Sequence, residues 1–387
     1  MADPKLKLGN DIWATKQKSL LAYNDEGGNF KSLPFQVDRI SGGTYLGRNG
    51  LIQTAASNEP RVDFTSNTKG ALLLEPQRTN GCLYSQTLSS WSVLNGASLQ
   101  TITDNDETAP DGTQTASTIT FSGNGSSLIR HFSNTSYTSA KHSCSFWVKK
   151  ISGNGSVFFG LNDTETEFTP TDKWVRYEIN NITPTNFGVN LFLDLNFVCS
   201  AGDKISVWGM QLEAGTYSTS IIPTSSAAVT RVKDQVTKGG NQYIFNDSEG
   251  VLFAELEALA EGTTTRKICL TNGSTNFINF NFNATSGRVT FEFGSTSNSF
   301  YILNSNGHTL TNKNKIAIKY KSGDTDCYIN GTRVTGSNGT FTLSGLDRVN
   351  TENRATNGSQ VMFAKIYQLM YFNTALTDAE LITLTTL

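Results

Sequence analysis

The chain has 387 residues, of which only 17% are charged, and its formal net charge is −2. This balance excludes broad electrostatic attraction to nucleic acid or to an anionic membrane surface, because both require a clear excess of lysine and arginine. A chain of this length exceeds what one hydrophobic core usually serves, so we expect two or three domains. The N-terminus has no apolar run typical of a signal peptide, and no stretch of about 18 apolar residues predicts a membrane span.

The five cysteines are widely separated and odd in number. None is part of a CxxC pair or of a Cys/His pair at the spacing of a metal site. We therefore expect free thiols that are buried as small hydrophobic residues, in a protein made in a reducing cytosol. They are Cys82, Cys144, Cys199, Cys269 and Cys327.

Residues 1–80 are the least regular part of the sequence, with short apolar runs between turns rich in Gly and Asn. We expect an N-terminal attachment or oligomerisation segment. From 81 to 230 the sequence predicts strands separated by turns. Between 187 and 195 every second residue is apolar, which puts these side chains on one face of a long strand, in the core. That set is Phe187, Val189, Leu191, Leu193 and Leu195.

A second β-module is predicted over 231–387. Residues 277–282, 289–293 and 316–320 each alternate apolar and polar side chains. Asn330-Gly331 lies at the tip of a hairpin, because this dipeptide favours the positive φ values of a type I′ turn. Thr377 and Glu380 have the spacing of a capping box and predict one short terminal helix.

Strands every 8–12 residues with scarcely any helix indicate sandwiches. The predicted fold class is all-β, with two β-sandwich (jelly-roll) domains in tandem after the irregular segment. No phosphate-binding loop or serine-hydrolase motif is present, and we expect no cofactor.

Three stretches resemble structural proteins of tailed bacteriophages. The first runs from Gly50–Gln53 through Pro60–Phe64 and is followed by GALLLEPQRTN at 70–80; it is similar to the leading segment of tail-fibre and tail-spike-like proteins. In such proteins a carbohydrate-binding-type jelly roll follows this segment. The end of that jelly roll resembles the second stretch, VWGMQLEAGTYSTSIIPT at 207–224, with Thr230-Arg231 just after it. The third resemblance is to the end of a laminin-G or concanavalin-A-like sandwich, and it is carried by YINGTRV at 328–334 and IYQLMYFNTALTDAEL at 366–381.

The resemblance implies a protein of the virion surface that is assembled in the host cytoplasm. It also implies a homotrimer, contacts with other virion proteins through the N-terminal segment, and a bacterial surface glycan as partner. Fold resemblance does not establish a ligand.

One pair of carboxylates has a spacing that hydrolysis could use. Residues two apart on a strand lie roughly 7 Å apart, which is beyond the separation of about 5–5.5 Å in retaining glycosidases and within the about 6.5–9.5 Å of inverting ones. Glu255 and Glu257 have this spacing, but the third acid, Glu261, does not continue it. The alternative is an outward-facing row of acids, with Leu252, Ala254 and Leu256 pointing inward.

An acidic turn cluster could hold a structural Ca²⁺ ion, as related jelly rolls often do. Asp104, Asp106 and Asp111 are its candidate ligands. Ala109 stands where the calcium-binding hand needs glycine, so ordinary turn residues are the competing interpretation.

Two tryptophans next to polar turns are candidates for stacking on sugar rings, namely Trp91 and Trp174. Aromatic residues are also commonly buried, so core packing is the alternative. The three histidines are isolated from one another in sequence and suggest no catalytic site.

The sequence therefore favours a phage tail fibre or receptor-binding protein that binds a bacterial surface glycan and is not an enzyme. A head fibre, capsid decoration or tail-collar component is the first alternative. An envelope glycan depolymerase that uses Glu255 and Glu257 is the second.

Overall fold

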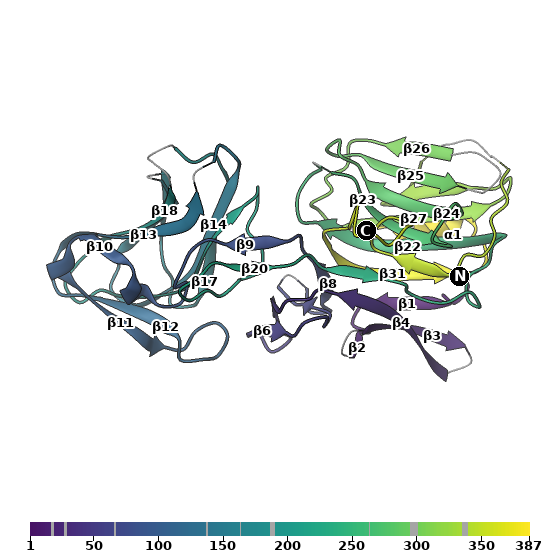
Figure 1. Cartoon of the computed structure of the whole chain (residues 1–387). Coiled ribbons are helices and arrows are strands. Elements are labelled where there is room, and N and C mark those ends of the chain that lie inside the picture. Colours follow the sequence, from purple (N-terminus) through teal and green to yellow (C-terminus); the bar gives the residue numbers. More distant parts are fainter. Residues whose placement is uncertain are drawn as a thin grey trace. The chain divides into compact units, whose positions relative to one another are not determined.

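A computed structural model describes residues 1–16, 19–26, 29–65, 67–136, 138–162, 164–185, 190–262, 264–294, 301–334 and 340–387. The chain forms two compact units (Figure 1). Unit 1 comprises Met1–Arg48, Ala55–Pro76 and Lys233–Leu387, and unit 2 comprises Asn49–Thr54 and Gln77–Val232. Unit 2 is thus inserted into the sequence of unit 1.

Unit 1 is a sandwich of two antiparallel sheets. The smaller sheet has the order β26-β25-β24-β23-β30. The predicted alternation is confirmed, because Ile278, Phe280 and Phe282 point into the core while Asn279 and Asn281 lie on the other face. The strands are β23 (Arg266–Thr271), β24 (Phe277–Phe282), β25 (Val289–Gly294), β26 (Tyr301–Ser305) and β30 (Arg348–Asn350).

The larger sheet runs in the order β21-β4-β3-β1-β31-β22-β27-β28-β29, with β2, β7 and β8 attached to it. Its N-terminal strands are β1 (Leu6–Gly9), β2 (Ala14–Lys16), β3 (Ser19–Glu26), β4 (Asn29–Asp38), β7 (Val62–Asp63) and β8 (Ala71–Leu74). Its C-terminal strands are β21 (Gln235–Thr237), β22 (Glu249–Ala258), β27 (Asn314–Lys321), β28 (Asp326–Ile329), β29 (Thr332–Val334) and β31 (Ala364–Phe372). A further short strand, β5, spans Gly43–Leu46.

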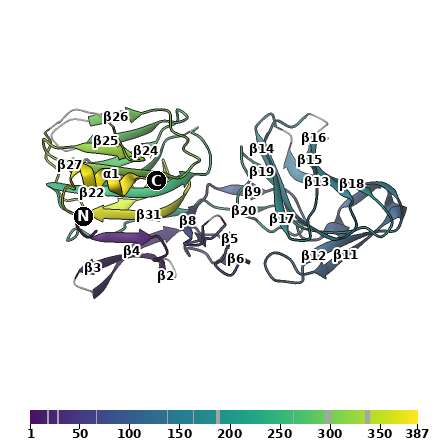
Figure 2. The same ribbon diagram turned by 180° about the vertical axis from the view of Figure 1, so that it is seen from behind.

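One helix, α1 (Asp378–Thr385), covers part of the outer face of the larger sheet, where it lies over β27 (Figure 2). Leu381 packs there against Phe253 and Tyr328. The Thr377 side chain accepts a hydrogen bond from the Glu380 N–H, and the Glu380 carboxylate accepts one from the Thr377 N–H, which confirms the predicted capping box. The described part of the chain contains no helix with the length and apolar character needed to cross a bilayer.

Unit 2 is a second sandwich, made of two five-stranded sheets in the orders β10-β13-β18-β15-β16 and β11-β12-β19-β14-β17. Leu191, Leu193 and Leu195 are all buried in its core as predicted, whereas Phe187 and Val189 lie outside the described residues. The first sheet contains β10 (Ser92–Asn95), β13 (Gly125–Ser136), β15 (Ser156–Leu161), β16 (Thr164–Phe168) and β18 (Asn190–Cys199). The second contains β11 (Gln100–Glu107), β12 (Ala116–Phe121), β14 (His142–Ser152), β17 (Val175–Ile182) and β19 (Lys204–Ala214), and the short elements are β6 (Ile52–Ala55), η1 (Leu88–Ser90) and η2 (Ala97–Leu99).

The strands that lead into and out of unit 2 are hydrogen-bonded neighbours. β9 (Arg78–Asn80) pairs antiparallel with β20 (Val229–Arg231), so that Arg78 is opposite Arg231. Just outside these strands, in unit 1, the Asp234 N–H donates to the Glu75 carbonyl at 3.0 Å. The chain therefore leaves unit 1 and returns to it at adjacent points.

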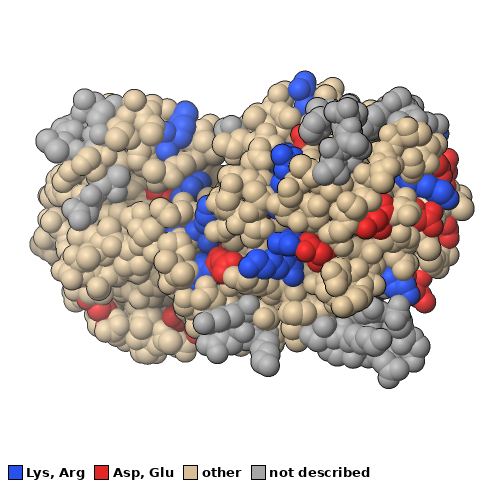
Figure 3. Space-filling view, turned by 45° about the vertical axis from the view of Figure 1, so that its right-hand side comes forward, with Lys and Arg blue, Asp and Glu red and all other residues tan. Residues whose placement is uncertain are grey.

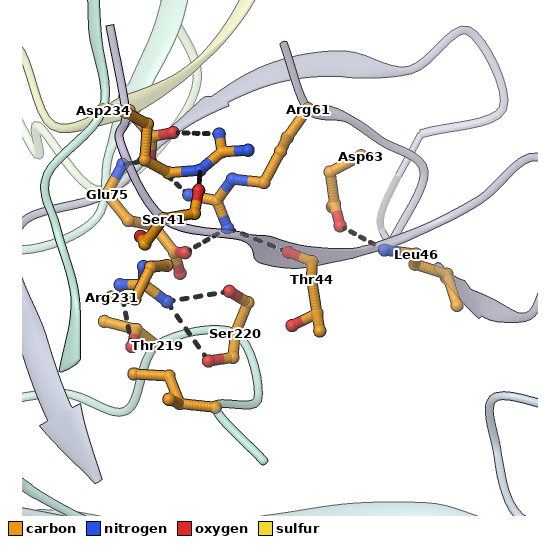
Figure 4. Close-up of polar contacts among 12 residues, drawn as sticks. Ser41, Thr44, Leu46, Arg61, Asp63, Glu75, Thr219, Ser220, Arg231 and Asp234 are labelled. Carbon is orange, nitrogen blue, oxygen red and sulfur yellow. Dashed lines mark hydrogen bonds and ion pairs between the residues drawn. The ribbon is translucent and has the colours of Figure 1, made fainter. Parts of the chain in front are cut away.

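A buried ion network in unit 1 includes the acids next to these strands (Figure 4). The Asp234 carboxylate accepts hydrogen bonds from both Arg39 and Arg61, the former at 2.8 Å. Arg61 also donates to Glu75 at 2.6 Å and to the Thr44 carbonyl at 2.8 Å. Arg61 of the stretch at 60–64 and Glu75 of the stretch at 70–80 thus meet in one network.

The all-β class is confirmed, but the observed division of the chain differs from the tandem arrangement predicted. Residues 1–80 supply β1, β3, β4, β7 and β8 to the sheet of unit 1 instead of forming a separate segment. Leu6 pairs with Tyr371 across β1 and β31, and Leu72 pairs with Ile366 across β8 and β31. The sandwich of unit 1 is therefore completed by strands from both ends of the chain.

Two local predictions are also confirmed. Asn330 and Gly331 have φ values of 50° and 78°, as a type I′ turn between β28 and β29 requires. All five cysteines are buried free thiols. Burial raises the pKa of the Cys269 thiol to about 12, which keeps it protonated and unreactive near neutral pH.

Candidate functional site

A polar groove of about 650 Å³ lies on the outer face of the larger sheet of unit 1. We call it the outer groove. Its volume is within the range of about 300–1,000 Å³ typical of ligand sites. Its lining residues come from five separate parts of the chain, and are Asn10, Asn67, Thr68, Lys69, Glu255, Lys313, Lys315, Tyr367 and Gln368.

The floor of the outer groove is a cross-strand row of polar side chains. Glu255 on β22 is in register with Gln368 on β31 and with Lys315 on β27. Leu252, Ala254 and Leu256 of β22 point into the core, and alternation along the strand puts Glu255 on the opposite face. The row is therefore accessible because the sheet buries its other face.

One wall depends on a close approach of two backbones. Gly9 has a φ of +92°, and a Cβ there would lie 2.2 Å from the Tyr367 carbonyl oxygen, so only glycine fits. The N–H of Asn10 donates to the same carbonyl at 2.9 Å. This turn brings the Asn10 amide to the edge of the groove.

The turn at Asn67–Lys69 forms another part of the groove lining. The Asn67 Oδ1 accepts a hydrogen bond from the Lys69 N–H at 2.7 Å, which fixes the turn. The Lys69 Nζ donates to Asn10 Oδ1 at 2.9 Å, and the Trp13 Nε1–H donates to the Lys69 carbonyl at 2.8 Å. The N-terminal strands thus hold this turn beside strands from the C-terminal half of the chain.

Charges in the groove are arranged around Lys313. Its Nζ lies 3.3 Å from the Glu255 carboxylate and 4.2 Å from the centroid of the Tyr367 ring. The aromatic face attracts the ammonium, so the ring and the carboxylate together fix its position. The Lys315 Nζ donates to the Thr386 carbonyl at 2.7 Å.

Charged side chains make up a minor part of the chain, at 17% of its residues. On the face of the molecule shown in Figure 3, lysine and arginine are interspersed with aspartate and glutamate, and most of the described surface is neither. Three lysines and one glutamate lining a single groove are therefore a local concentration of charge.

Only one carboxylate of the predicted pair lines the groove. Glu255 lines it, whereas Glu257 is not among the lining residues. A register shift between Glu255 and Leu256 interrupts the pairing of β22 with β31 at this point. Both acids are partly exposed on the outer face of the strand, as the non-catalytic alternative expects.

Glu261 has a structural role at the end of the same strand. Its carboxylate accepts hydrogen bonds from the Leu310 N–H at 2.7 Å, the Ser286 hydroxyl at 2.9 Å and the Gly287 N–H at 3.1 Å. Burial acts to raise the pKa of Glu261, but these hydrogen bonds outweigh it and lower the pKa. Glu261 is therefore an ionised anchor for two loops.

The two candidate tryptophans belong to unit 2, whereas all the residues that line the outer groove belong to unit 1. Trp91 is 5% exposed and its ring lies 4.9 Å from that of His131 within the core. That placement leaves no ring face open for a sugar, so the structure gives Trp91 a packing role. Trp174 is partly buried and its Nε1–H donates to the Thr108 carbonyl at 2.8 Å.

The three candidate calcium ligands do not form a cluster. The Asp104 carboxylate accepts hydrogen bonds from the Ser117 hydroxyl at 2.6 Å and from Ser89. Asp111 caps its own turn by accepting from the Thr113 N–H at 2.9 Å. Asp106 is exposed on β11, and within the described ranges no group of three His, Cys, Asp or Glu side chains is placed to hold a metal ion.

Sequence reasoning pointed to Glu255 and missed the rest of the groove. Lys69, Lys313 and Tyr367 lie far apart in sequence and belong to no motif that predicts binding. The one available signal was Gly9-Asn10, a turn dipeptide after an apolar strand, but nothing in the sequence identifies the carbonyl that it approaches.

No protein-family model matches the chain, and no curated protein matches it in sequence. Solved structures similar to it include domain 4 of AbnA, a GH43 extracellular arabinanase from Geobacillus stearothermophilus, in complex with arabinotriose (12% identity, TM-score 0.33, 44% of this chain and 84% of that chain). Mouse laminin alpha1 domains LG4-5 are another (8% identity, TM-score 0.27, 66% and 90%). A third is the CBM22-1-CBM22-2 tandem of Paenibacillus barcinonensis Xyn10C (11% identity, TM-score 0.27, 76% and 97%). Similarity at this level carries no functional argument, and the all-β class rests on the strands described above.

Proposed function

We propose that this chain is a virion surface protein of a tailed bacteriophage, a tail fibre or receptor-binding protein, and that it binds a bacterial surface glycan without catalysis. The resemblance of three stretches to phage structural proteins supports the location on the virion. The outer groove supports the binding of a glycan.

The observation on which the binding proposal depends is the chemistry of the groove lining. Amides from Asn10, Asn67 and Gln368 and a hydroxyl from Thr68 surround a space of about 650 Å³. Amides and hydroxyls both donate and accept hydrogen bonds, which is what sugar hydroxyls require. Gln368 is on a strand of the floor, and hydrogen bonds hold the turns that carry Asn10 and Asn67, so these groups are positioned before a ligand arrives.

The absence of catalysis is part of the same proposal. Glycoside hydrolysis ordinarily needs two carboxyl groups on either side of the scissile bond. The described lining of the groove contains one, Glu255, and it faces Lys313 at 3.3 Å.

The proposal is tested with purified protein on host cells and on polysaccharide extracted from them. Asn67→Ala combined with Gln368→Ala removes two lining amides, and we expect binding to fall at least about tenfold, since each lost polar contact costs about 1 kcal/mol. Gln36→Ala, an exposed amide on β4 of the same sheet, serves as the control and should bind as the unmodified chain does.

Other outcomes would overturn the proposal in different ways. Undiminished binding by the double variant would remove the groove as the site. Equal binding to host and non-host cells would instead favour a head fibre, decoration or tail-collar role. Release of reducing ends from the polysaccharide, lost in Glu257→Gln, would establish a depolymerase.

A further inference from the structure

We infer that the outer groove selects a negatively charged glycan, one whose sugars carry anionic groups such as carboxylates. This inference rests on the proposed function and specifies the class of its ligand. It is argued from the sign of the charge in the groove and from the partners of each charged group.

The groove reverses the charge balance of the chain. The whole sequence has 31 lysines and arginines and 33 aspartates and glutamates. The groove is lined by Lys69, Lys313 and Lys315 against Glu255, which is three positive charges and one negative charge, or a net charge of +2. A concave surface with an excess of one sign attracts ligands of the opposite sign.

Two of the three lysines contact neutral oxygens. The Lys69 Nζ contacts the Asn10 amide oxygen at 2.9 Å, and the Lys315 Nζ contacts the Thr386 carbonyl at 2.7 Å. Each ammonium has three N–H donors, so each of these contacts leaves donors for a ligand. Within the described lining, Glu255 is the one carboxylate, and it faces Lys313.

Lys313 is held in place before a ligand binds. The Tyr367 ring lies 4.2 Å from its Nζ and the Glu255 carboxylate lies 3.3 Å from it. A ligand carboxylate therefore meets a fixed cation and does not have to order a flexible side chain. Glu255 competes with that carboxylate for the same ammonium.

The chemistry of the cations indicates how the ligand is recognised. The described lining contains lysine and no arginine. Lysine acts as a compact point charge, whereas arginine reads planar anions through a two-pronged fork. Recognition should therefore depend on the charge of the sugar, with the amides of Asn67 and Gln368 contacting its hydroxyls.

The test compares saccharides of equal length that differ in charge. Oligogalacturonate, a sulfated oligosaccharide and a neutral malto-oligosaccharide are titrated against the full chain by calorimetry at about 50 mM and about 300 mM salt, because screening weakens exposed charge pairs. We expect the carboxylated saccharide to bind tighter than the neutral one, and its advantage to shrink at high salt. Tighter binding of either anionic saccharide than of the neutral one supports the inference, and the sulfated saccharide shows whether charge alone decides the affinity.

The two failures are distinguishable. Equal binding of neutral and carboxylated saccharides would overturn the inference and leave the proposed function intact. No binding to any saccharide or to host polysaccharide would overturn both.

Variants of opposite sign provide the sharper result. Lys315→Met and Lys69→Met should each weaken binding of oligogalacturonate about two- to fivefold, and Glu255→Gln should strengthen it by a similar factor, the range expected for partly exposed charge pairs. Misfolding cannot produce the gain expected for Glu255→Gln. Lys321→Met is the control, because Lys321 is on the same strand, outside the groove lining, and pairs with Glu249 at 3.1 Å. A loss of affinity in Glu255→Gln, or an equal effect in Lys321→Met, would contradict the inference.

Discussion

Arg61 is a buried cation whose partners are two buried acids and a backbone carbonyl. Burial acts to lower the pKa of Arg61, but the carboxylates of Asp234 and Glu75 outweigh it and raise the pKa further. The side chain therefore stays charged at any pH at which the protein folds. Removing it would leave acids buried without their counter-ion, which is more costly than losing the attraction alone.

We expect Arg61→Met to reduce the free energy of unfolding of unit 1 by about 3–5 kcal/mol, the usual cost of breaking a buried ion pair from one side. Scanning calorimetry should show the loss as a lower transition temperature of unit 1. Lys321→Met breaks an exposed pair with Glu249 and should cost no more than about 1 kcal/mol. Similar losses in the two variants would show that the buried network is not a main source of stability.

The burial of single residues was the feature of this molecule that its sequence predicted least well. Sequence alone suggested that Trp91 could be exposed, because polar turns flank it, yet its ring packs in the core of unit 2. Burial is decided by which strands pack over a residue, and that information lies elsewhere in the chain. Glu255 was identified because alternation along one strand places it on the outer face, which is a local property.

Elements were far more predictable than single residues, because their signals are local. β24 begins at Phe277 and ends at Phe282, the range that its alternation predicts. The type I′ turn at Asn330-Gly331 and the helix after Thr377 follow from φ preferences and from capping chemistry within a few residues.

The cap of α1 can be tested as an element. Thr377→Ala removes the side chain that accepts from the Glu380 N–H, and we expect it to cost about 1 kcal/mol in the stability of unit 1. Thr383→Ala changes the same residue type at an exposed position inside the helix and should be neutral or slightly stabilising, since alanine favours helix. Urea unfolding followed by far-ultraviolet circular dichroism measures both. Equal effects at the two positions would show that the cap does not matter.

The order of domains along the chain could not be predicted from local pattern. β1 and β8 pair with β31, so residues near one end of the sequence complete a sheet built mainly by the other end. Period-two alternation predicts which residues of a strand face inward, but not which distant strand is its neighbour. For the same reason Lys69, Lys313 and Tyr367 could not be assembled into one groove from the sequence.

The insertion predicts that unit 1 folds without unit 2. Residues 77–232 can be replaced by two glycines between Pro76 and Lys233, because Glu75 and Asp234 are already hydrogen-bonded to each other. Chain ends that lie together are where domain insertions are tolerated. We expect a β-rich circular dichroism spectrum and one calorimetric transition from the shortened chain. An unfolded or aggregated product would show that unit 1 depends on unit 2.

The paired strands β9 and β20 also have a consequence for how such a protein changes over time. The segment Gln77–Val232, which forms most of unit 2, is attached by two neighbouring crossings, so its length does not alter the path of the chain through the sheets of unit 1. We expect that the gene segment encoding residues 77–232 can be exchanged as a cassette at Gln77 and Val232, which leaves Glu255 and Lys313 where they are.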